Sequence, residues 1–246
     1  MPTRAPEETD ILCESCGYML NGLPPSGKCP ECGSPIDLSI SERLRQPPLW
    51  ENIGSFRSTT LAFLRTSSQI IFQPTHFFRT STTRGPLSPA RHFAQIHWVI
   101  SSLLIGLAAW DHWKWFETKV IYKDPSPLLR CVMFLALPVI TFIALAGTIH
   151  LAARLTTWEG TYRGYRLPRL VVLRVLYYHA AHIFLVALLA LITCVGYISF
   201  LRDRLISPWM GDLAYLWTLC GEVIVAAVYL FYTYWIGMKN SMYANR

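Results

Sequence analysis

Charged residues are scarce in this sequence. Only 15% of the 246 residues are Asp, Glu, Lys or Arg, whereas 52% are hydrophobic and 13% are aromatic. Soluble domains usually carry about 25% charged residues. The deficit argues against an ordinary soluble protein and predicts that much of the apolar surface lies in a lipid bilayer.

The sequence also lacks the features of a secretory signal peptide. The first ten residues, Met1 to Asp10, contain no apolar run, and a signal peptide needs an apolar core of about 7–15 residues. We therefore expect internal segments to insert into the membrane. No internal repeat or low-complexity tract is present.

Motifs of common enzyme classes are absent as well. The chain has no H-E-x-x-H motif, no G-x-S-x-G motif and no glycine-rich loop of the kind that holds phosphates. The sequence therefore predicts a protein that is not an enzyme.

Composition divides the chain into three regions. Residues 1–40 are polar, rich in glycine and proline, and contain four of the seven cysteines; residues 41–91 form a mixed, basic linker; residues 92–246 alternate long apolar runs with short charged loops. A helix needs about 20 apolar residues to cross a hydrocarbon core about 30 Å thick. We predict an all-α integral membrane helical bundle of about four spans, near residues 93–110, 131–153, 175–201 and 213–238.

Arginines fall on alternate sides of the predicted spans. Seven arginines against two glutamates precede the first span within residues 41–91, and five against one glutamate separate the second and third spans, whereas the first and third connections balance their charges. The positive-inside rule then places both termini in the cytoplasm, on the inner face of the cell inner (cytoplasmic) membrane. An even number of spans agrees with this orientation.

The linker contains an amphipathic segment, Ile53–Phe72. Its apolar residues recur at near-helical spacing, arginine, serine and threonine lie between them, and Pro74 ends the run. This pattern is typical of a helix that lies on the inner leaflet, with its arginines near anionic headgroups. A helix packed against the bundle and a re-entrant segment are the alternatives.

The cysteines of residues 1–40 form two C-x-x-C-G knuckles, Cys13 to Cys16 and Cys29 to Cys32, with twelve residues between them. Four thiolates can hold one tetrahedral Zn²⁺ at about 2.3 Å, and we expect a turn near Gly22 to join two short strands. Because four cysteines close the coordination shell, the predicted zinc is structural and stabilises a segment too small to bury its own core.

Three other interpretations of the cysteine segment are weaker. A disulfide pair needs an oxidising compartment, but the charge pattern places this segment in the cytoplasm. A redox C-x-x-C needs a βαβ context that a segment rich in glycine and proline does not provide. Nucleic acid is an unlikely partner, because Lys28 is the only cation between Cys13 and Ser41. A docking surface for a partner protein or a purely structural role is the preferred interpretation.

Ionisable residues inside the predicted spans are candidates for a second site. His179 and His182 lie three residues apart on one helix face, and Glu222 lies within the fourth span. Together they could supply two imidazoles and one carboxylate to a metal or proton site. The alternative is that the histidines lie at the interface and that Glu222 is protonated or hydrogen-bonded to a neighbouring helix.

Two parts of the chain resemble known families. The segment Cys13-x-x-Cys-Gly-Tyr-x-Leu-x-Gly-Leu23 through Cys29-Pro-Glu-Cys-Gly-Ser-Pro35 resembles the N-terminal zinc ribbons of many bacterial membrane proteins. The segments Pro74-Thr-His-Phe-Phe-Arg79 and Leu173-Arg-Val-Leu-Tyr-Tyr-His179 resemble the Yip-type (Rab-interacting) membrane family. The second resemblance implies a helical bundle without catalytic residues that acts in membrane organisation or trafficking through partner proteins. That family usually has five spans, whereas four are predicted here; the Ile53–Phe72 segment and a break around Leu167–Tyr178 are the two candidates for the missing one.

The sequence thus predicts a non-enzymatic, multi-span membrane protein with a structural zinc ribbon, ligated by Cys13, Cys16, Cys29 and Cys32, that serves as a cytoplasmic protein-docking module. The lipid bilayer and a protein bound at the ribbon are the expected partners. The alternative function is a small transporter or a membrane-embedded, metal-dependent enzyme that uses His179, His182 and Glu222.

Overall fold

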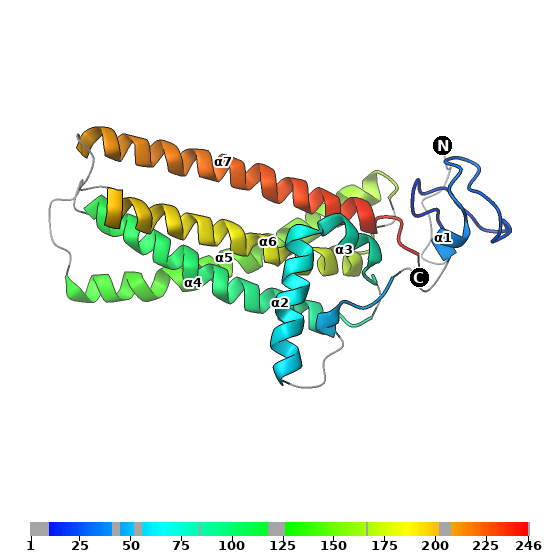
Figure 1. Ribbon diagram of the computed structural model, residues 1–246, viewed down its shortest axis with the longest axis horizontal. Coiled ribbons are helices and arrows are strands. Elements are labelled where there is room, and N and C mark those ends of the chain that lie inside the picture. Colours follow the sequence, from blue (N-terminus) through cyan, green and yellow to red (C-terminus); the bar gives the residue numbers. More distant parts are fainter. Residues whose placement is uncertain are drawn as a thin grey trace. The chain divides into compact units, whose positions relative to one another are not determined.

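The described part of the chain is all-helical. A computed structural model describes residues 10–40, 45–51, 56–83, 85–117, 126–165, 167–201 and 208–245. Within these residues there are seven α-helices and no strand (Figure 1). The elements in chain order are α1 (Asp37–Ile40), the 3-10 turn η1 (Leu49–Glu51), α2 (Phe56–Phe72), α3 (Pro74–Thr80), α4 (Ser88–Phe116), α5 (Pro127–Tyr162), α6 (Arg169–Gly196), the π-helical turn η3 (Tyr197–Leu201) and α7 (Pro208–Ser241).

Four of the helices are long and apolar enough to cross a membrane: α4, α5, α6 and the Gly211–Ser241 part of α7. They coincide with the four predicted apolar spans. The first, second and fourth helices extend beyond the predicted bounds at both ends, whereas α6 begins before residue 175 and ends at Gly196, from where η3 continues to Leu201. Charged or aromatic residues occur in the extensions of α4 and α5, as expected of helix ends that leave the hydrocarbon core. Most charges of the first and third connections lie outside the described residues.

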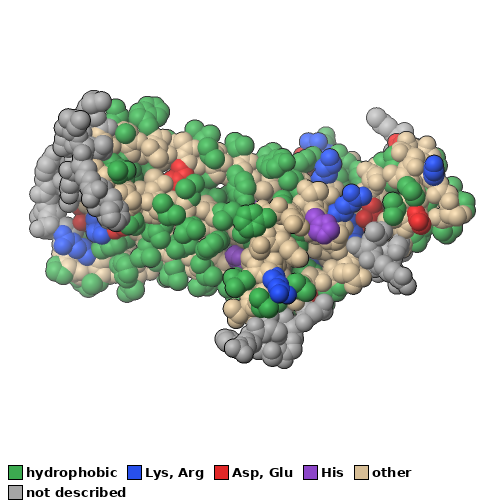
Figure 2. Space-filling model, viewed as in Figure 1, with side chains coloured by type: hydrophobic (Ala, Val, Ile, Leu, Met, Phe, Trp, Pro, Cys, Tyr) green, Lys and Arg blue, Asp and Glu red, His purple; other side chains and the backbone are tan. Residues whose placement is uncertain are grey.

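Large apolar side chains are exposed along α5 and α7, whereas α4 and α6 bury more of their apolar residues. Leu135 and Ile143 on α5 and Ile224 and Phe231 on α7 are all exposed, and hydrophobic side chains dominate the face seen in Figure 2. An exposed apolar surface of this extent is unfavourable in water and favourable in contact with lipid hydrocarbon. Helices can lie in hydrocarbon because their amides and carbonyls are hydrogen-bonded within the helix.

The contacts group the chain into two compact units. Unit 1 consists of Met1–Ala94, Ile149–His179 and Thr233–Arg246, and unit 2 consists of Gln95–Thr148 and Ala180–Tyr232. In unit 2, α4 and α5 pack closely at Gly106, where an added Cβ would lie 2.5 Å from Cγ of Pro138. Pro138 lies inside α5 without ending it, as neighbouring helices permit in membrane proteins.

The amphipathic linker segment is helical, as predicted, over Phe56–Phe72; Ile53 lies outside the described residues. One face of α2 packs in unit 1, where the Phe63 ring lies 5.7 Å from Trp50 and 5.2 Å from Phe93. On the remaining surface, Leu64 and Phe72 are exposed. One face of the helix is thus packed against neighbouring elements, and another face exposes apolar side chains, which suits a membrane surface.

Candidate metal centre

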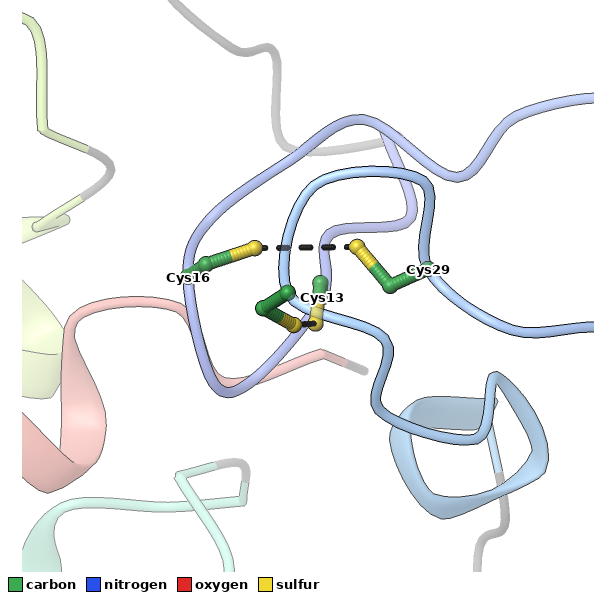
Figure 3. Close-up of side chains that lie close together, drawn as sticks. Cys13, Cys16 and Cys29 are labelled. Carbon is green, nitrogen blue, oxygen red and sulfur yellow. Dashed lines mark hydrogen bonds between the residues drawn. The ribbon is translucent and has the colours of Figure 1, made fainter.

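The four predicted cysteine ligands converge in space. One sulfur from each of Cys13, Cys16, Cys29 and Cys32 lies within 4.8 Å of the other three (Figure 3). The Sγ atoms of Cys13 and Cys32 are 3.5 Å apart, and those of Cys16 and Cys29 are 3.6 Å apart. A tetrahedron of sulfurs about 2.3 Å from a central ion has edges of about 3.8 Å. The cluster is therefore compatible with a metal ion.

The same distances argue against disulfides. Each of the four cysteines is free, and the contacts of 3.5 and 3.6 Å far exceed a sulfur–sulfur bond of about 2.05 Å.

The two knuckles share one backbone design. Gly17 donates to the carbonyl of Cys13 (2.8 Å), and Gly33 donates to that of Cys29 (2.9 Å). Both glycines have positive φ, 82° and 72°, a conformation that favours glycine because it has no Cβ. Each turn therefore brings its two cysteines to the same side of the loop, which explains why the local sequence alone was sufficient to predict the cluster.

The expected pair of short strands is not present among the described residues. Instead, an isolated bridge closes each knuckle locally, Leu12 with Met19 and Lys28 with Pro35. The segment between the knuckles contains Pro24 and Pro25, which have no amide hydrogen to offer a strand ladder. Apolar burial in the segment is small: Leu12, Leu20 and Ile36 are buried with Cys13 and Cys29, as expected of a segment that needs a further staple to be stable.

The surroundings of the thiols differ across the cluster. Hydrogen bonds from the hydroxyl and the backbone amide of Ser34 lower the pKa of the Cys32 thiol to about 6, whereas partial burial raises the pKa of Cys16. Metal ions bind the thiolate form. Cys32 is also the exposed member of the four.

The cysteine segment, here called the ribbon (residues 10–40), is bound to the C-terminal residues of the same unit. The side chain of Asn245 accepts a hydrogen bond from the Leu12 amide (2.8 Å) and donates to the carbonyls of Leu12 (2.5 Å) and Ser39 (2.7 Å). The Tyr243 ring lies against Gly17, where an added Cβ would approach Cε1 to 2.6 Å. We call these contacts the C-terminal clamp.

Arg45 in the linker strengthens the clamp from the other side. It forms an ion pair with Glu14 of the ribbon (3.0 Å) and donates to the carbonyl of Asn240 in α7 (2.9 Å). The same guanidinium donates to the carbonyls of Phe78 and Ser81. Glu14 in turn accepts from the Asn245 amide (3.1 Å). Sequence reasoning missed Arg45 and Asn245, because their partners lie far away along the chain.

The histidine candidates do not form a metal site in the described residues. His179 contacts the Thr233 hydroxyl (2.9 Å), and His182 contacts the Tyr229 hydroxyl (2.7 Å). The carboxyl oxygens of Glu222 are buried, and no regular hydrogen bond reaches them within the described part of the chain. The cysteine cluster is the one group there that brings three or more potential metal ligands together.

Unit 2 contains a polar aromatic cluster that the sequence pattern did not reveal. Asp212 on α7 accepts hydrogen bonds from Trp115 (3.0 Å) and Tyr197 (2.9 Å). Tyr197 stacks on Tyr215 with ring centroids 4.3 Å apart, and Tyr215 contacts His112 (2.9 Å). Trp115 thus joins α4 to α7 through a carboxylate.

Comparison with family models, curated proteins and solved structures gives no match to this chain. The resemblances to bacterial zinc ribbons and to the Yip-type family therefore stay predictions.

Proposed function

We propose that the protein is a non-enzymatic, multi-span inner-membrane protein whose cysteines bind one structural zinc ion and whose ribbon docks a cytoplasmic partner protein. The convergence of four sulfurs within 4.8 Å carries the metal part of the proposal. Zinc is preferred among sulfur-binding metals because structural Cys₄ sites with paired C-x-x-C knuckles are typical of it. Membrane organisation or trafficking is the process that such a scaffold would serve.

The C-terminal clamp supports an orientation with both termini on one side of the membrane. Asn245 can reach Leu12 only if the two segments occupy the same compartment. The surplus of arginine before the first span and between the second and third assigns that compartment to the cytoplasm.

The docking surface lies on the part of the ribbon that the clamp leaves open. Tyr18 and Met19 at the first knuckle and Leu38 on α1 are exposed large side chains on a segment of only 31 described residues. Aromatic residues and methionine are enriched in the cores of protein interfaces. We propose that these three residues contact the partner.

Metal analysis of the purified full-length protein tests the zinc centre. We expect one zinc per chain, its loss in the Cys29→Ser, Cys32→Ser variant, and its retention in a Cys131→Ser, Cys220→Ser control. The control replaces exposed cysteines that lie in the long helices, outside the cluster. Absence of zinc from the native chain would refute the centre.

A photocrosslinker tests the docking role. Placed at Met19 in cells, it should give one discrete protein adduct that disappears in the Cys29→Ser, Cys32→Ser variant, whereas the same group at Pro25, an exposed residue between the knuckles, should not. Equal adducts at both positions would contradict a defined docking surface.

The alternative with a second site makes a different prediction. A metal that persists in the Cys29→Ser, Cys32→Ser variant would favour a transporter or metal-dependent enzyme based on His179, His182 and Glu222. The hydrogen bonds of the two histidines to Thr233 and Tyr229 give that alternative no support.

A further inference from the structure

A cavity of about 510 Å³ opens in unit 1 where the ribbon, the linker and the ends of α3 and α7 meet. Its walls include the cations Arg45, Arg79 and Lys239, the carboxylate of Glu14, and the rings of Tyr165 and Trp235. The size and the mixture of cations with aromatic rings suit a ligand that is part anion and part apolar.

Among the Lys, Arg, Asp and Glu side chains that line the cavity, three are cations and one is a carboxylate. Arg45 and Glu14, 3.0 Å apart, neutralise each other. Arg79 and Lys239 are exposed and form no ion pair or hydrogen bond with any residue that the structure describes. The adjacent arginine, Arg163, is already paired with Glu159 at 2.8 Å. Arg79 and Lys239 thus face one cavity without an ion-pair partner among the described residues, and Cys16 of the sulfur cluster lies in the same wall.

Aromatic residues indicate that this cavity lies at the depth of lipid headgroups. Trp235 precedes Lys239 by one helical turn on α7 and is 53% exposed. On α5, Trp158 and Tyr162 are exposed by 72% and 86%. Amphipathic rings concentrate at the membrane–water interface, where one edge is apolar and the other can hydrogen-bond.

A smaller, mainly apolar cavity continues from the first. The two share Tyr165, Trp235, Lys239 and Met242, and the smaller one is also lined by Leu167 and Met238. A free phosphate ion would make no favourable contact with this apolar extension, whereas the acyl chains of a lipid would. The pair of cavities therefore favours a phospholipid over a soluble anion.

We propose that this cavity binds the headgroup of an anionic phospholipid. Arg79 and Lys239 contact the phosphate, and Trp235 contacts the glycerol and the first carbons of the acyl chains. Basic pockets next to membrane helices on the cytoplasmic side are suited to this ligand. The inference goes beyond partner docking, although it rests on the membrane placement of α7 in the proposed function.

The test compares lipid selectivity of the full-length protein in nanodiscs of phosphatidylcholine with and without phosphatidylglycerol. The measured quantity is the ratio of phosphatidylglycerol to phosphatidylcholine that remains bound after detergent exchange. Because each cation near an anionic lipid contributes about fivefold, we expect the ratio to fall about thirtyfold in the Arg79→Gln, Lys239→Gln variant and about fivefold in either single variant. Arg65→Gln, Arg169→Gln is the control, since both arginines are exposed outside the cavity, and its ratio should stay within twofold.

Two results would overturn the inference. An unchanged lipid ratio together with loss of zinc in the Arg79→Gln, Lys239→Gln variant would show that the cations balance the negative charge of the thiolate centre. If inorganic phosphate alone displaces the bound phosphatidylglycerol, and if Trp235→Leu leaves the lipid ratio unchanged, the cavity is a site for free phosphate and not for a lipid. Zinc content is measured on the same samples, so a protein that selects anionic lipid but holds no zinc would refute the metal centre and leave this inference intact.

Discussion

Arg174 on α6 donates a hydrogen bond of 2.5 Å to Oε1 of Glu51 in η1. The side chains of the two residues are only 4% and 8% exposed. Tyr178 donates to the same oxygen (2.6 Å), and a second nitrogen of Arg174 donates to the carbonyl of Pro86 (2.8 Å). This buried network fastens the linker of unit 1 to α6.

Removal of one partner from that network should destabilise the protein strongly. Arg174→Met leaves the carboxylate of Glu51 buried without its cation, which costs about 3–5 kcal/mol. The expected result is a large fall in the thermal unfolding temperature of the purified protein in detergent.

A double variant provides the control for this network. Arg174→Met, Glu51→Leu should be less destabilised than the sum of the two single variants, because no unpaired charge remains. Strict additivity of the three variants would contradict a coupled pair.

Alanine substitutions of the two knuckle glycines distinguish the effect of backbone strain from the effect of a contact in the C-terminal clamp. Gly17 and Gly33 both have positive φ, 82° and 72°, so alanine at either position costs about 1–2 kcal/mol. Gly17→Ala must also displace the Tyr243 ring, whereas a Cβ at Gly33 meets no atom within 4 Å. Gly17→Ala should therefore release zinc to a chelator faster than Gly33→Ala does.

A second substitution tests the cause of that difference. Combined with Tyr243→Ala, the Gly17→Ala variant should behave like Gly33→Ala, because the ring that it displaces is no longer present. A difference between the two glycines that persists without the Tyr243 ring would mean that the ring contact is irrelevant.

Asn245 should protect the ribbon against opening. Asn245→Ala removes the acceptor of the Leu12 amide and the donor to the Leu12 carbonyl. Since each lost hydrogen bond is worth about 1 kcal/mol, exchange of the Leu12 amide hydrogen should accelerate by about tenfold or more. Asn240→Ala is the matched control, because its side chain donates to the carbonyl of Ile236 in its own helix and to no other residue that the structure describes. Equal protection in both variants would argue against the clamp.

Reporter fusions test the sidedness that the clamp supports. A reporter active only in the cytoplasm should be active when fused at either end of the chain, and an external protease should cleave neither fusion in intact cells. Fusions on opposite sides would be incompatible with the hydrogen bonds between Leu12 and Asn245.

The sequence was most informative where structure depends on local spacing. Two C-x-x-C-G knuckles position their own cysteines through hydrogen bonds within five residues, so Cys13, Cys16, Cys29 and Cys32 could be predicted as one cluster. The long helices follow from apolar composition and length. Spacing also placed His179 and His182 on one face, but it could not reveal that each contacts a hydroxyl of α7.

Contacts between side chains that lie far apart along the chain could not be predicted from the sequence. Nothing local distinguishes Arg174, which is buried against Glu51, from Arg169, which is exposed. The same holds for Arg45 and Asn245, whose partners belong to other segments. The expected strands of the ribbon failed for a different reason, since prolines between the knuckles remove the amides that a ladder needs.

The C-terminal clamp has a consequence for the order of events during synthesis. The ribbon leaves the ribosome first, whereas Asn245, which holds Leu12 and Ser39, is translated after all four long helices. The ribbon can therefore fold before the clamp forms, and the clamp can close only after α7 has been synthesised. A chain that stalls before α7 is complete leaves the clamped face of its ribbon uncovered, which gives proteases and chaperones a surface that distinguishes unfinished molecules from finished ones.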